Sequence, residues 1–115
     1  MIACAICPTT ADDPTGWSTW ELEEPIEWRS AFATDGAMPP TPAGRYQLCP
    51  ACTSWMPGHR SAPLPEALRS GIDTMLGAQQ LHPATRRRLL AELVGNVRHL
   101  AGRLTPAITE KEEDR

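Results

Sequence analysis

The chain has 115 residues, 41% of them hydrophobic, 12 prolines and a net charge of −3. A chain of this length has room for one small core with an appendage, not for two full cores. It holds no apolar run near the roughly 20 residues that a membrane-spanning helix needs, so we expect no membrane association.

Charge is divided unevenly along the chain. Residues 1–44 hold seven acidic residues and one arginine, a net charge of −6, whereas residues 45–104 hold eight arginines and three acidic residues, a net charge of +5. Residues 105–115 add a further −2. This distribution excludes a uniformly basic nucleic-acid-binding protein and leaves a localised basic surface possible.

The four cysteines fall into two C-x2-C pairs, Cys4 with Cys7 and Cys49 with Cys52. Two such pairs supply the four soft ligands of a tetrahedral Zn²⁺ site, so we predict a structural zinc ion held by these residues. Disulfides would need an oxidising compartment, and the N-terminus does not read as a signal peptide. A thioredoxin-like redox pair is disfavoured because it follows a strand, and Cys4 has almost no chain before it. We therefore expect a cytoplasmic protein with reduced cysteines.

Two strands are predicted after the first cysteine pair. A turn signal at residues 12–16 precedes a strand at 17–22. Apolar residues at even positions of 26–32, including Phe32, predict a second, half-buried strand. The Glu-Glu-Pro break at 23–25 leads us to expect that the two strands pair as an antiparallel hairpin.

The segment before the second cysteine pair reads as a loop and a short strand. Residues 34–44 hold three prolines and two glycines and predict a surface loop. Residues 45–48 predict a closing strand that completes a three-stranded sheet.

A resemblance to a known family rests on three segments: Cys4-x2-Cys7, Gly16-Trp17 and Tyr46-Gln47-Leu48-Cys49-Pro50-x-Cys52. Together they resemble the short zinc-ribbon proteins of high-GC actinobacteria and their phages. In these, a C-x2-C knuckle precedes a Gly-Trp strand and a closing strand runs into Leu-Cys-Pro-x-Cys. The resemblance covers residues 3–56 and implies an N-terminal zinc ribbon with a small antiparallel sheet.

The spacing departs from the simplest ribbon. Between Cys7 and Cys49 lie 41 residues, against about 15–20 in the simplest pattern, so a treble-clef arrangement stays open. Rubredoxins also use two such knuckles, but Thr53 stands here where they carry glycine. A rubredoxin-like electron carrier therefore remains only as an alternative.

The second half of the sequence predicts helices. A helical turn at 53–56 should end at Pro57-Gly58, which disfavours a long helix after Cys52. One amphipathic helix is predicted from Pro65 to about residue 80, and another from 83 to 104. The complete prediction is an α+β fold with a zinc-ribbon domain at 1–57, a linker at 58–64, an antiparallel helical hairpin at 65–104 and a disordered charged tail at 105–115.

Two faces of the last predicted helix are candidate binding surfaces. The arginine face, which would contact phosphates or an acidic partner, comprises Arg87, Arg88, Arg98, His99 and Arg103. The leucine seam, which would pair helices within the chain or in a homodimer, comprises Leu90, Leu93, Val97, Leu100 and Leu104. The arginine face could instead be solvated surface that binds nothing, and the leucine seam could instead pack only within the chain.

The sequence holds no catalytic constellation. His59, His82 and His99 have no i,i+4 partner of ligand type, and a site with four cysteines needs none of them. We find no nucleophile placed with a base and no glycine-rich phosphate loop. The sequence thus predicts a non-enzymatic zinc-stabilised adaptor or regulator that binds a protein partner, with DNA or RNA binding through the arginine face as the alternative.

Overall fold

The computed structural model describes residues 1–30 and 37–107; for residues 37 and 38 it describes the backbone only. The fold is α+β, with small antiparallel sheets and three α-helices among these residues. At the N-terminus, β1 (Ile2–Ala3) pairs with β2 (Thr10–Ala11), and the first cysteine pair lies in the turn between them.

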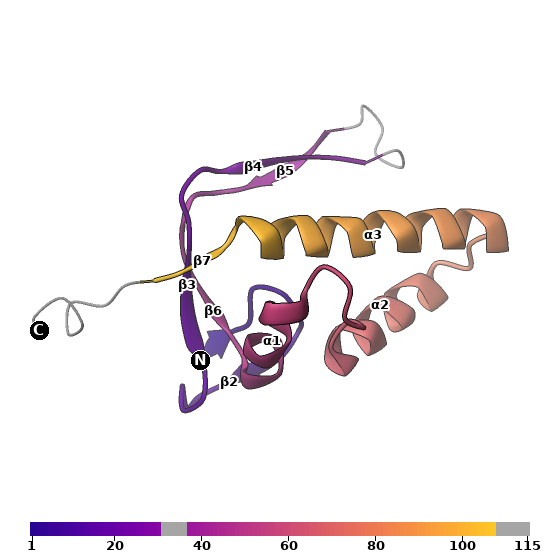
Figure 1. Ribbon diagram of the computed structural model, residues 1–115. Helices are drawn as coiled ribbons and strands as arrows, with labels where there is room; N and C mark the ends of the chain where they lie inside the picture. The colour runs from indigo at the N-terminus through magenta and orange to yellow at the C-terminus, as the bar shows by residue number, and fades with distance from the viewer. Residues whose placement is uncertain (31–36, 108–115) are drawn as a thin grey trace, which may run out of the picture.

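A long, bent, two-stranded ribbon runs through the fold (Figure 1). β3 (Ser18–Leu22) pairs with β6 (Gly44–Leu48), and β4 (Ile26–Arg29) pairs with β5 (Ala37–Thr41), both antiparallel. The ribbon turns sharply where residues 23–25 and 42–43 separate the two sheets. β6, the closing strand predicted at 45–48, leads directly into the second cysteine pair.

The predicted hairpin between residues 17–22 and 26–32 is wrong. β3 pairs with β6 and with β7 (Thr105–Pro106), while β4 pairs with β5. Proline fixes φ and removes an N–H donor, so Glu-Glu-Pro at 23–25 bends the chain without reversing it. Phe32, predicted to belong to the second strand, lies outside the described residues.

The loop predicted at 34–44 is also wrong over residues 37–41, which form β5. Pro39 and Pro40 led to the loop prediction. They are tolerated because β5 is an edge strand of a two-stranded sheet. An edge strand pairs on one side only, so a proline that lacks an N–H donor can be placed where no strand needs that hydrogen bond.

A three-stranded sheet is present, but its third strand comes from the other end of the chain. The strand order is β6-β3-β7, and Trp20 and Glu21 of β3 pair with Pro106 and Thr105. The charged tail predicted at 105–115 therefore begins with an ordered strand. Residues 108–115 lie outside the described part.

The two long predicted helices are present, with ends within two residues of those expected, whereas the helical turn predicted at 53–56 begins three residues earlier, at Pro50. α1 (Pro50–Trp55) continues into a 3₁₀ turn at Met56–Gly58, and α2 (Glu66–Ala78) and α3 (Pro83–Arg103) follow. His82 Nδ1 accepts a hydrogen bond from the amide of Ala84 at 3.1 Å and caps α3. No helix in the described ranges is long and apolar enough to cross a membrane.

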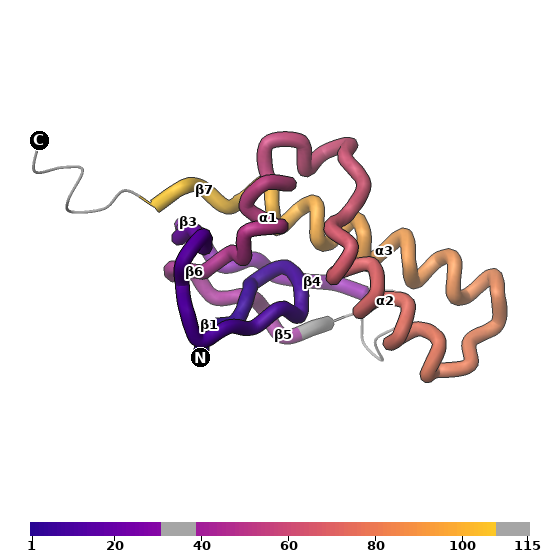
Figure 2. Tube along the Cα trace, turned by 90° about the horizontal axis from the view of Figure 1, so that it is seen from below, coloured from indigo at the N-terminus to yellow at the C-terminus, as the bar shows by residue number. Residues whose placement is uncertain are grey.

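α3 lies between the β4–β5 ribbon and α2 (Figures 1 and 2). On the ribbon side, the rings of Trp28 and His99 meet edge to face at 5.7 Å, and the Ser30 hydroxyl donates to Glu92 at 2.5 Å. On the other side, α2 and α3 meet through residues 79–82 and diverge from there. The helix thus packs against both halves of the chain.

A single cluster of buried residues joins the two halves. Cys7, Leu22 and Leu48 belong to the same cluster as Leu76 and Ala101 of the helices. Residues 58–64, predicted as a linker, also contribute, since Leu64 is buried. The cysteine pairs therefore belong to a core that the C-terminal helices share.

Candidate metal centre

The first cysteine pair is positioned by the β1–β2 hairpin. The amide of Cys4 donates to the carbonyl of Thr9 at 2.9 Å and closes the turn. The amide of Ile6 donates a hydrogen bond to Cys4 Sγ at 3.5 Å. This local geometry follows from the C-x2-C spacing, which turns two sulfurs and nearby amides toward one point.

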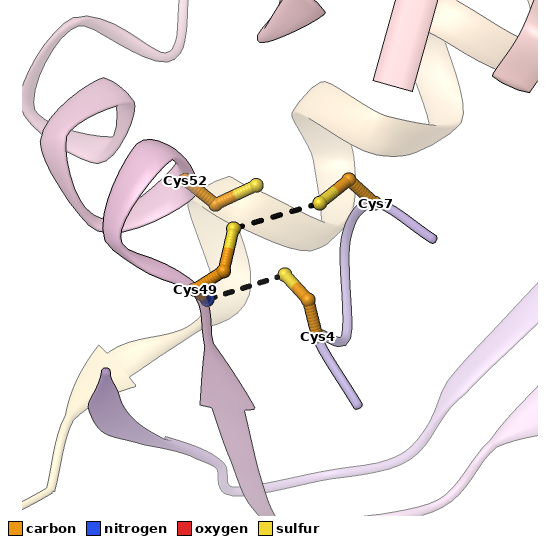
Figure 3. Close-up of side chains that lie close together, drawn as sticks. All are labelled: Cys4, Cys7, Cys49 and Cys52. Atoms are coloured by element: carbon orange, nitrogen blue, oxygen red, sulfur yellow. Dashed lines mark hydrogen bonds between the residues drawn. The ribbon is translucent and has the colours of Figure 1, made fainter. Parts of the chain in front are cut away.

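The second pair is positioned where β6 passes into α1. Cys49 is the N-cap of α1, Pro50 is its first residue and Cys52 lies in its first turn. The amide of Cys49 donates to Cys4 Sγ at 3.4 Å, which ties the two knuckles together (Figure 3).

The two pairs bring four sulfurs to one point (Figure 3). All four Sγ atoms lie within 4.8 Å of one another, and Cys7 Sγ lies 3.5 Å from Cys49 Sγ. All four are free thiols. A tetrahedral zinc site with Zn–S bonds of about 2.3 Å has sulfur–sulfur edges of about 3.8 Å, so the cluster has the dimensions of a metal site.

Burial and hydrogen bonding affect the thiols differently. The hydrogen bond with the Cys52 side chain, aided by backbone amides, lowers the pKa of Cys4 to about 4. The same hydrogen bond, together with burial, raises the pKa of Cys52. Burial raises the pKa of Cys7, against the hydrogen bond to Thr9. The fold therefore stabilises a thiolate most at Cys4.

The chemistry of the donor set fits a metal ion. Cys7, Cys49 and Cys52 are at most 5% exposed, and Cys4 is half-buried. Four thiolates complete a tetrahedral shell and leave no open position for a substrate or water. Among residues 1–30 and 37–107, the four cysteines are the one group of His, Cys, Asp or Glu side chains close enough together to hold a metal ion. The arrangement can bind a metal and hold two segments of chain together.

The histidines lie in other surroundings. His59 Nδ1 is 2.9 Å from the carbonyl of Met56, and its ring meets Trp55 edge to face. His82 caps α3. The histidines thus have identifiable local contacts apart from the metal cluster.

The structure separates the members of the arginine face. Arg98 Nη1 donates to the carbonyls of His59 and Ala62, at 2.5 and 3.1 Å. His99 packs against Trp28. Arg87, Arg88 and Arg103 are solvent-exposed. Arg98 and His99 therefore make contacts within the fold.

The leucine seam contacts the chain's own core over most of its length. Leu104 is 5% exposed, and Leu93, Val97 and Leu100 are partly buried against the core cluster. Leu90 differs, with 36% of its surface exposed. It faces a groove between α2 and α3 that the sequence analysis missed, because helical periodicity does not show how far two helices diverge.

No protein-family model, curated protein or solved structure matches this chain.

Proposed function

We propose that this protein is a non-enzymatic, zinc-stabilised adaptor or regulatory protein that binds a macromolecular partner. The observation that carries the proposal is the cluster of four cysteine sulfurs within 4.8 Å. Zinc is the metal expected at a tetrahedral site of four thiolates, and with no open coordination position its role would be structural. Reduced cysteines would suit a cytoplasmic protein.

A structural ion would matter energetically. Zinc binding supplies about 10–16 kcal/mol of apparent free energy in small zinc peptides. The whole stability of a small domain is about 5–15 kcal/mol. Loss of the ion would therefore remove a stabilising term as large as the stability itself, which favours metal as a folding requirement over metal as a catalyst.

Metal analysis tests the proposal directly. Full-length protein purified without chelator should contain one zinc per chain by plasma mass spectrometry. Cys7→Ser or Cys52→Ser should reduce that content strongly, whereas Thr53→Ser should not. A substoichiometric metal content with intact disulfides would contradict the proposal. A red protein with one iron per chain would favour the rubredoxin-like alternative.

The alternative function is DNA or RNA binding through the arginine face. Phosphate contacts would fall mainly on the members of this face that are solvent-exposed arginines, which are Arg87, Arg88 and Arg103. Binding through phosphates weakens steeply with salt. An oligonucleotide titration at low and high salt, on wild type and the triple alanine variant, tests this alternative.

A homodimer through the leucine seam is a further proposal on assembly. Light scattering coupled to size exclusion measures it. A Val97→Asp variant should disrupt an apolar contact in either a hairpin or a dimer, so a change in mass rather than in stability identifies the dimer.

A further inference from the structure

α2 and α3 diverge with distance from residues 79–82, which join them (Figure 1). Residues of both helices line a groove between them. Its volume is about 280 Å³, and its apolar lining includes Leu64, Ile72, Leu90 and Val94. Leu64 and Ile72 are buried, whereas Leu90 is 36% exposed and reaches solvent at the edge. The groove therefore presents an aliphatic floor with one accessible leucine.

The charges at the groove are mainly positive. Arg69 and Arg98 line it together with Asp73, whose carboxylate lies 4.0 Å from Arg86 Nη2. The three charged residues that line the groove carry a net charge of +1, and the single acidic one, Asp73, is paired with Arg86 outside the lining. The two hydrogen bonds from Arg98 Nη1 to His59 and Ala62 hold that guanidinium in place. A charge held in this way loses little conformational entropy when a partner binds.

We propose that this groove is the docking site for an acidic segment of a partner protein, which inserts one large apolar side chain between α2 and α3. The inference rests on the proposed adaptor function and specifies the surface and the partner's chemistry. The carboxylates that flank the apolar side chain pair with Arg69 and Arg98.

The size of the groove favours a side chain over a whole ligand. Pockets for drug-sized molecules measure about 300–1,000 Å³ and enclose most of the molecule. A groove of about 280 Å³ that is open to solvent suits a single anchor residue, the usual centre of a protein interface. Its lining residues are aliphatic or charged rather than aromatic, so it offers no ring on which a nucleic-acid base stacks.

The experiment is a selection from a phage-displayed random 12-residue peptide library on zinc-loaded, full-length protein. Enriched peptides should share one large apolar residue flanked by Asp or Glu. A synthetic peptide of that consensus should bind wild type in a fluorescence anisotropy titration. Its affinity should fall about tenfold or more for Leu90→Glu, as for an interface hot spot. Arg69→Glu should also weaken it.

Met75→Glu is the matched control. Met75 is 42% exposed on α2 and does not line the groove, so the variant adds the same charge to the surface and should bind within about twofold of wild type. All three sites are exposed, and thermal melts should be nearly unchanged.

Several outcomes overturn the proposal. These are a failure to enrich peptides, a basic or purely polar consensus, or equal binding by wild type and Leu90→Glu. If the protein forms a dimer that dissociates in Leu90→Glu, the occupant of the groove is a second copy of the chain. If the protein binds an oligonucleotide and Arg69→Glu abolishes that binding, the occupant is a nucleic acid. The two proposals fail separately: a low metal content contradicts the structural zinc, whereas failed enrichment on fully metallated protein contradicts the groove alone.

Discussion

Arg87 and Arg98 lie on the same side of α3 by sequence spacing but differ in their contacts. Arg87 is exposed, whereas Arg98 is half-buried and donates to two backbone carbonyls of the segment before α2. Those carbonyls would lose a charged donor in Arg98→Ala. A hydrogen bond to a charged group contributes about 1.5–3 kcal/mol.

We therefore expect Arg98→Ala to reduce the free energy of unfolding by about 2 kcal/mol and Arg87→Ala to change it by less than about 0.5 kcal/mol. Urea unfolding of both variants, followed by circular dichroism, measures the difference. Equal stability of the two variants would mean that the contacts of Arg98 contribute nothing.

The cysteine thiols predict how metal binding depends on pH. Burial raises the pKa of Cys7, and a hydrogen bond to Cys4 together with burial raises that of Cys52. A raised thiol pKa favours the protonated form, and a proton must leave before the sulfur binds metal. Metal affinity should consequently fall as the pH falls.

Competition with a chromophoric chelator between about pH 8 and pH 5 measures this dependence, since zinc affinity of thiolate sites is strongly pH-dependent. The apparent zinc affinity should decrease steadily as the pH falls over this range. The helical circular dichroism signal should still be present near pH 8, so that the first part of the decrease is measured on folded protein. An affinity that is constant over this range would contradict thiolate ligation.

Two glycines of α2 have different surroundings. A Cβ at Gly77 would meet no atom within 4 Å, whereas a Cβ at Gly71 would lie 3.2 Å from Pro8 Cγ. Pro8 directly follows the metal-site residue Cys7. The missing side chain at Gly71 thus lets α2 approach the first knuckle closely.

Alanine at an exposed helix position is about 1 kcal/mol more favourable than glycine. Gly77→Ala should gain most of this and raise the melting temperature by several degrees. Gly71→Ala should gain clearly less, because the methyl group must displace Pro8. Calorimetric melts of the zinc-loaded variants compare the two. An equal gain in stability would show that Pro8 moves away from the new methyl group at no energetic cost.

The core shared by the two halves of the chain predicts how metal loss affects folding. Sequence boundaries alone favour two steps, with residues 1–56 unfolding while the helices persist. In the structure, Cys52 and Leu48 share a core cluster with Leu76 and Ala101, and β7, which follows α3, pairs with β3. Unfolding of the knuckles would expose one side of the helices.

We therefore expect chelation to reduce the helical circular dichroism and the tryptophan fluorescence together, in one transition. The two signals should have the same midpoint in chelator and in urea. Retention of the full helical signal after complete metal removal would instead show that residues 65–104 fold alone.

Features that depend on local chemistry could be predicted from the residues alone. Two C-x2-C pairs identify the four clustered sulfurs, since that spacing directs both thiols of a pair to one point. Pro83 and the apolar periodicity of 83–104 located α3, because helix signals are carried by neighbouring residues.

Features that depend on residues far apart in the chain became visible in the folded protein. The partners of β3 come from residues 44–48 and 105–106, and no local pattern states which strand pairs with which. The same holds for Arg98, whose acceptors lie 36 and 39 residues away, and for the groove beside Leu90. These depend on how α3 sits between the ribbon and α2, which is set by the packing of one shared core.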